Sequence, residues 1–156
     1  MKIQKKYFIR SIALSVVFFC WNIISSLLLY KYLGVSLGKQ ISERYSITVE
    51  FILVVIIAPI IETILFQYLL ITQVYISYNG KNKKTIAILL SAFCFAIIHS
   101  YSLYYFLVTL FGGIFLAYFF CSFKDNTNTI SAILYLTLIH SLTNLYIFLI
   151  KTLNLL

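Results

Sequence analysis

Four polar residues that can do chemistry lie inside strongly apolar runs: Glu62, His99, His140 and Asn144. Glu62 could act as a general base on a water molecule. His99 and His140 could hold that water, stabilise an oxyanion or bind a divalent metal such as zinc. Asn144 could donate a hydrogen bond to a developing oxyanion. These residue types suit hydrolysis, but no HExxH pair is present, so the usual zinc-protease signature is absent.

Glu62 is the residue on which this interpretation depends. A charged carboxylate at the centre of a bilayer costs from ~2.5 kcal/mol to several times that, so it must be paired, protonated or turned to a wet cavity. Pro59 precedes it by almost one turn, lacks an amide donor and frees the carbonyl of Val55. In lipid, a freed carbonyl is tolerated only where neighbouring groups or water satisfy it. A protonated Glu62 that only packs helices together is the alternative.

Helix geometry predicts that these side chains lie at one depth. Measured from the ends that we expect to be cytoplasmic, Glu62 lies ~24 Å deep, His99 and Asn144 ~21 Å, and His140 ~15 Å. His140 and Asn144 are four residues apart and share a helix face. We therefore expect the four groups to converge. Purely structural hydrogen bonds between helices are the alternative for each histidine, and Asn144 alone could pack without chemistry.

The composition predicts an all-α fold, a polytopic membrane helix bundle of about five transmembrane helices. The 156 residues are 62% hydrophobic with a mean hydropathy of +1.00, which a soluble domain of this size does not need. We predict one integral membrane domain over residues 1–156, with a polar loop at residues 31–46. The predicted spans are 8–29, 47–78, 85–100, 103–123 and 130–150. The first span is expected to be the least functional, and Gly112-Gly113 in the fourth would let another helix approach closely.

Basic residues encode topology in this chain. The net charge of +8 could suggest nucleic acid, but Lys and Arg fall in the short gaps between apolar runs, so we expect lipid and not nucleic acid as the partner. One side of the membrane receives eight: Lys2, Lys5, Lys6, Arg10, Lys81, Lys83, Lys84 and Lys124. The other receives four: Lys31, Lys39, Arg44 and Lys151. The bias predicts a multi-pass cell-membrane protein with a cytoplasmic N-terminus and an extracytoplasmic C-terminus.

Three short motifs carry a family resemblance. They are Glu62-Thr63-Ile64-Leu65-Phe66-Gln67, Phe95-Ala96-Ile97-Ile98-His99 and His140-Ser141-Leu142-Thr143-Asn144, within a core at residues 54–148. In this order they resemble the CPBP family of intramembrane endopeptidases, which includes CAAX proteases and bacteriocin-processing enzymes and is also called the abortive-infection family. The resemblance implies an all-helical membrane endopeptidase in which Glu62 activates water, His99, His140 and Asn144 complete the site, and Thr63, Gln67 and Phe95 support it.

Two positions depart from the family pattern. The second glutamate of the first motif is Thr63 here, and its arginine is Gln67, which can form hydrogen bonds but carries no charge. The first hypothesis is therefore a peptidase acting on a peptide or membrane-protein substrate. The second is a non-catalytic relative, such as a bacteriocin self-immunity or scaffold protein. A proton or ion pathway through the same polar groups is a third, weaker hypothesis.

Overall fold

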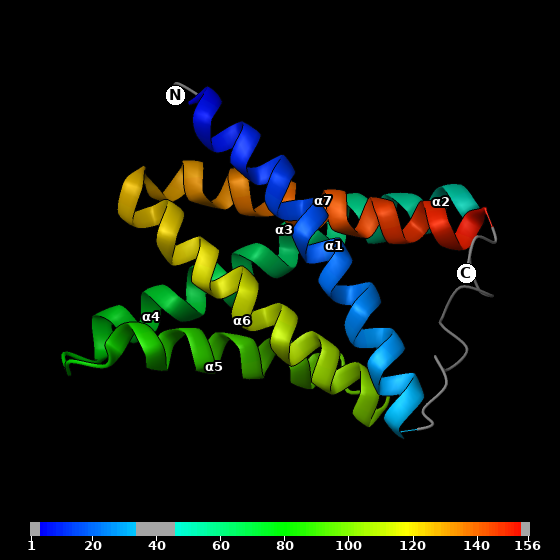
Figure 1. Cartoon of the computed structure of the whole chain (residues 1–156). Coiled ribbons are helices and arrows are strands. Elements are labelled where there is room, and N and C mark those ends of the chain that lie inside the picture. The colour runs from blue at the N-terminus through cyan, green and yellow to red at the C-terminus, as the bar shows by residue number, and fades with distance from the viewer. Residues whose placement is uncertain (1–3, 34–45, 154–156) are drawn as a thin grey trace.

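The chain folds as a bundle of long helices (Figure 1). The computed structural model describes residues 4–33 and 46–153, and no strand occurs in those ranges. The elements are α1 (Lys5–Leu33), α2 (Ile47–Phe51), η2 (Ile52–Ile57), α3 (Ala58–Glu62), η3 (Thr63–Leu70), α4 (Ile71–Ser77), α5 (Lys83–Ile98), α6 (Leu103–Asn126) and α7 (Thr129–Thr152). The predicted all-α class is confirmed. Most of the predicted loop at 31–46 lies outside the described residues.

Four helical segments in the described ranges are long and apolar enough to cross a membrane: Lys5–Leu29, Ile47–Ser77, Leu103–Asn126 and Thr129–Thr152. The chain is therefore a multi-pass membrane protein. The segment predicted as a further span, 85–100, is the shorter helix α5, with 16 residues. Its rise of ~24 Å is less than the ~30 Å of a hydrocarbon core. Helix α5 ends at Ile98, and the chain then turns. The first bond of this turn runs from the His99 amide to the carbonyl oxygen of Ala96.

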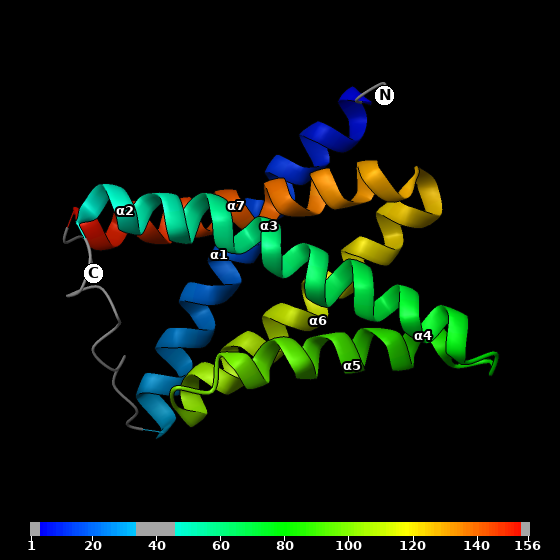
Figure 2. The ribbon, with the colours of Figure 1, turned by 180° about the vertical axis from the view of Figure 1, so that it is seen from behind.

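The segment from α2 to α4 is one continuous helix with two π-helical stretches, η2 and η3. Sequence length predicts that a run of this size must tilt, kink or protrude. Figure 2 shows that its direction changes after α3, so that its first half follows α7 and its second half follows α5. Wider π turns on both sides of the five residues of α3 accompany this change. Glu62, the last residue of α3, therefore lies where the helix changes course.

Close helix contacts fix the positions of α5, α6 and α1. A Cβ atom on Gly113 of α6 would lie 2.8 Å from the Cα of Ala92 on α5, so only glycine permits this approach. A Cβ on Gly112 would lie 3.1 Å from the Phe18 ring of α1. The predicted role of this glycine pair is thus visible in two different contacts. Because α5 carries His99, the Gly113 contact also helps to place the candidate site.

Helix α1 is more closely tied to the site than the sequence predicts. It packs mainly against α7. Thr143 Oγ1 on α7 donates to the Ser15 carbonyl over 3.2 Å, and the backbone amide of Gln4 donates to the Tyr135 hydroxyl over 2.8 Å. These contacts lie on both sides of His140 along α7. Helix α1 therefore braces the helix that presents this histidine.

Candidate active site

Glu62 lies between the two histidines, as the depth estimates predict. Its Oε1 is 3.6 Å from His99 Nε2, and its Oε2 is 3.6 Å from His140 Nε2. The side chain of Glu62 is 16% exposed, that of His99 19% and that of His140 7%. Three different helical segments, α3, the end of α5 and α7, supply these groups. The carboxylate thus faces imidazoles and not lipid alone.

The imidazole of His99 is held in one orientation by its own helix. Its Nδ1 lies 2.8 Å from the carbonyl oxygen of Phe95. Because a carbonyl only accepts hydrogen bonds, Nδ1 must carry the proton of this pair. In the neutral ring, Nε2 is then an acceptor that faces Glu62 Oε1. Two acceptors at 3.6 Å repel each other unless a proton lies between them or a water molecule beside them donates to both.

His140 is in a different situation. Its Nδ1 is buried and has no hydrogen-bond partner among the described groups. The proton of a neutral ring is therefore best placed on Nε2, which faces Glu62 Oε2. The two histidines then differ in role, because His99 presents an acceptor to the centre of the site and His140 presents a donor.

Phe95 sets the spacing of the two imidazoles. Its ring centroid is 4.5 Å from that of His99 and 6.0 Å from that of His140. On its other side it meets the Phe66 ring edge-to-face at 5.7 Å. Phe95 is 5% exposed, so it acts as a packed spacer between α5, η3 and α7. The family resemblance implies a supporting role for Phe95, which stays a prediction.

Asn144 does not point its amide at the carboxylate of Glu62. Its Nδ2 donates to the carbonyl oxygen of Val54 over 2.9 Å. In a π-helix each carbonyl accepts a hydrogen bond from the amide five residues later. For Val54 that residue is Pro59, which has no N–H to donate. The side chain of Asn144 therefore replaces the missing donor. The sequence predicts that Pro59 frees the carbonyl of Val55, and the structure shows the Asn144 amide at the neighbouring carbonyl, that of Val54.

Thr63 and Gln67 lie side by side on η3, and both are fully buried. Thr63 Oγ1 and both polar atoms of the Gln67 side chain have no hydrogen-bond partner among the described groups. Sequence reasoning missed a third polar residue on this helix contact, Ser91 of α5. Its hydroxyl donates to the carbonyl of Phe66 over 2.9 Å and so fastens η3 to α5. A buried serine in an apolar helix was the available signal.

A groove on the outer side of the bundle leads to Glu62. It has a volume of about 450 Å³. Apart from Glu62 its lining is apolar: Leu53, Ile57, Ala58, Ile61, Leu65, Phe66 and Ile98. Several of these side chains are exposed, including Ile61 at 49% and Ile98 at 50%. In a membrane protein such a surface faces lipid, so the carboxylate can be reached from the bilayer.

Two histidines and a glutamate are ligand types that zinc takes. Among residues 4–33 and 46–153, however, no group of three or more His, Cys, Asp or Glu side chains is arranged to hold a metal ion. No step of the chemistry below therefore passes through a metal ion. Bound zinc stays a prediction from the sequence, which metal analysis of the purified protein tests.

The comparisons with known proteins gave one match. The family model described as type II CAAX prenyl endopeptidase Rce1-like matches residues 44–146. This range is about two thirds of the chain and contains Glu62, His99, His140 and Asn144, while α1 lies outside it. The searches of curated proteins and of solved structures returned no match.

Proposed function

The chain belongs to the Rce1-like family of type II CAAX prenyl endopeptidases, and on this premise we propose that it is an intramembrane endopeptidase in which Glu62 activates a water molecule. One observation carries the proposal: both oxygens of a membrane-depth carboxylate face an imidazole Nε2 at 3.6 Å. A glutamate and two histidines in this relation provide a base, a second water acceptor and an oxyanion donor.

In the proposed reaction Glu62 acts twice, first as a base and then as an acid. A water molecule beside Glu62 and His99 donates one hydrogen bond to Oε1 and one to Nε2, and keeps its second proton throughout the attack. Glu62 takes one proton as the oxygen attacks the scissile carbonyl, and the C–O bond forms. His140 Nε2–H donates to the oxyanion. The tetrahedral intermediate then collapses, the C–N bond breaks, and Glu62 returns its proton to the leaving amine.

The substrate would enter from the lipid side. The groove beside Glu62 is apolar except for the carboxylate itself. Its size suits a few apolar side chains of a peptide or membrane-protein segment, because recognition sites are mostly apolar with few polar groups. A peptide at or within the membrane is therefore the proposed substrate class.

A second candidate function rests on Thr63 and Gln67. Their buried polar atoms lack partners at the two positions where the chain departs from the family pattern. A site whose supporting charges are gone could serve a non-catalytic role, such as bacteriocin self-immunity or scaffolding of a partner membrane protein.

The test is Glu62→Gln, which keeps the shape of the side chain and removes its basicity. Peptides from cells that carry the wild-type chain, the variant or no chain are compared by mass spectrometry. We expect cleavage products with the wild-type chain only, with a rate at least about 100-fold lower in the variant. Glu50→Gln is the matched control, because Glu50 is not part of the site. Its Oε1 pairs with Lys151 Nζ at a distance of 2.7 Å. If the Glu62→Gln protein accumulates normally and leaves peptides and phenotype unchanged, the endopeptidase proposal fails.

A further inference from the structure

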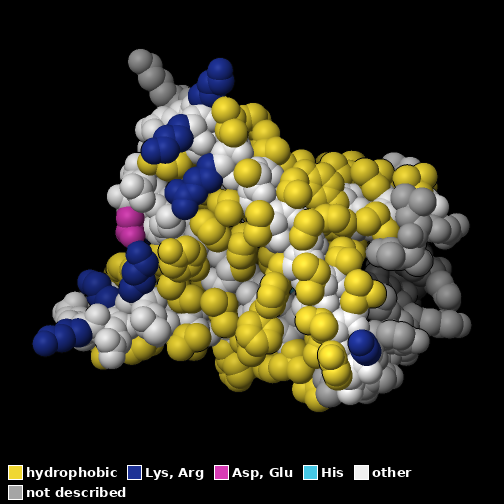
Figure 3. All heavy atoms as spheres, viewed as in Figure 1, with side chains coloured by type: hydrophobic (Ala, Val, Ile, Leu, Met, Phe, Trp, Pro, Cys, Tyr) yellow, Lys and Arg dark blue, Asp and Glu magenta, His cyan; other side chains and the backbone are white. Residues whose placement is uncertain are grey.

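Basic side chains gather at one end of the molecule. Figure 3 shows Lys and Arg around the end that carries the N-terminus, whereas most of the remaining visible surface is hydrophobic. In the described residues this end holds Lys5, Lys6, Arg10, Lys81, Lys83, Lys84 and Lys124. Of the three acidic residues that the structure describes, Asp125 lies here, Glu50 pairs with Lys151, and Glu62 belongs to the candidate active site. The end therefore carries a large uncompensated positive charge.

Two of these lysines converge on one aromatic ring. Lys83 Nζ lies 5.1 Å and Lys124 Nζ 5.5 Å from the ring centroid of Tyr75. Next to them, Lys84 Nζ pairs with Asp125 Oδ2 over 2.6 Å. Lys83 and Lys124 are half-buried and come from different helices, α5 and α6. Both ammonium groups thus lie close to the same ring, and neither forms an ion pair with an acidic residue in the described part of the chain.

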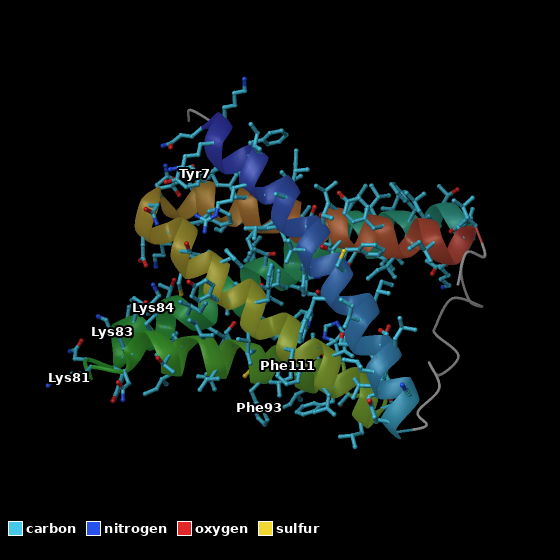
Figure 4. The ribbon with its side chains drawn as sticks, viewed as in Figure 1. Tyr7, Lys81, Lys83, Lys84, Phe93 and Phe111 are labelled. Carbon is cyan, nitrogen blue, oxygen red and sulfur yellow. The ribbon has the colours of Figure 1, made fainter. Side chains whose placement is uncertain are left out.

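The outer face of α5 continues from this cluster as an apolar stripe. Ile86, Leu90, Phe93 and Ile97 follow Lys83 at helical spacing and are 39%, 42%, 49% and 48% exposed. Figure 4 shows Lys83 at the α4–α5 turn and Phe93 further along the same helix. From Lys83 to Phe93 the helix rises ~15 Å, which is half of a ~30 Å hydrocarbon core. The part of the stripe from Lys83 to Phe93 thus matches the length of one leaflet.

We propose that Lys83 and Lys124 bind the headgroup phosphate of one anionic phospholipid, whose acyl chains lie along the outer face of α5. One phosphodiester carries a single negative charge, which offsets part of the charge of the two ammonium groups, and its oxygens can accept hydrogen bonds from both. The adjoining apolar stripe selects a lipid over a soluble anion, because it offers the acyl chains a surface continuous with the headgroup site. Lys84 remains bonded to Asp125 beside the site, so this pair adds no net charge.

The experiment uses the purified full-length protein in a neutral detergent. It is titrated with phosphatidylglycerol or with phosphatidylcholine of identical acyl chains, and bound lipid is counted by native mass spectrometry. We expect tight binding of one phosphatidylglycerol to the wild-type chain. In Lys83→Gln/Lys124→Gln its affinity should fall roughly 30-fold, as the loss of two lysines near a lipid surface predicts. Phosphatidylcholine binding should not change.

Two control variants separate this site from general electrostatics. Lys5→Gln/Lys81→Gln removes the same charge at the same end but leaves the Tyr75 cluster intact, and should keep the affinity within about twofold. Lys83→Arg/Lys124→Arg keeps the charge and should retain binding, which shows that loss in the Gln variant is not misfolding. Equal losses in both Gln variants, equal binding of the two lipids, or displacement of the lipid by millimolar inorganic phosphate would each overturn the proposal.

Discussion

The two histidines that flank Glu62 are not equivalent, because only His99 has its Nδ1 proton fixed by a carbonyl. His99 Nε2 must accept, while His140 Nε2 is the better donor. A glutamine side chain places an amide N–H near the position of Nε2, so it can replace a donor but cannot act as a basic imidazole acceptor. We expect His140→Gln to lower kcat about 10-fold and His99→Gln about 100-fold or more.

Steady-state hydrolysis of a substrate peptide by protein reconstituted in liposomes measures this difference. Phe95→Leu serves as a packing control, because it disturbs both rings and should affect both roles together. Equal losses in the two Gln variants would contradict the assigned asymmetry.

Gln67 is a buried side chain whose polar atoms have no partner among the described groups. An unsatisfied buried polar group costs about 1–3 kcal/mol, and an apolar side chain of the same shape avoids that cost. We expect Gln67→Met to raise the free energy of unfolding by about 1 kcal/mol without lowering hydrolysis. Denaturant titration in detergent micelles measures the change, with Gln73→Met at an exposed position as the control. A loss of stability would mean that the amide has a partner, such as a buried water.

At the scale of the helical elements, the position of Glu62 depends on how the bend around Pro59 is satisfied. Asn144 donates to Val54 O in place of the amide that Pro59 lacks. We expect Asn144→Ala to destabilise the protein by about 1–3 kcal/mol, because it leaves a carbonyl without its donor. With Pro59→Ala the chain regains a backbone N–H, so the same Asn144 substitution should cost at least about 1 kcal/mol less.

A double-mutant cycle of unfolding free energies measures this coupling. Asn22→Ala is a suitable control, because Asn22 also bonds a carbonyl, that of Phe18, but within its own helix. Additive effects of Pro59 and Asn144 would contradict the link between them.

The apolar runs predict the helices well, because burial in lipid demands about 20 continuous apolar residues and leaves a strong signal. They also place Glu62 level with the histidines. The apolar pattern does not predict the π turns, where Asn144 and Ser91 from other helices donate to the carbonyls of Val54 and Phe66. For the same reason the sequence could not show that Asn144 serves a backbone carbonyl, or that α1 braces α7 through Ser15.

On the scale of the whole molecule, the distribution of charge predicts how the chain sits in the membrane. The N-terminal part of α1, the α4–α5 turn and the α6–α7 turn lie at the same, lysine-rich end (Figures 1 and 3). Lys151 lies in the last turn of α7, away from that end. Because Lys and Arg are retained on the cytoplasmic side, we expect the lysine-rich end to face the cytoplasm.

Cysteine labelling tests this orientation. In a chain whose native cysteines are replaced by Ala, Asn82→Cys marks the α4–α5 turn and Thr152→Cys marks the end of α7. In intact cells a membrane-impermeant thiol reagent should label Thr152→Cys, whereas Asn82→Cys should react only after the membrane is permeabilised. Both variants must label equally in detergent, which controls for reactivity. The reverse pattern would place the lysine cluster outside, and the headgroup site proposed around Tyr75 would then belong to the outer leaflet.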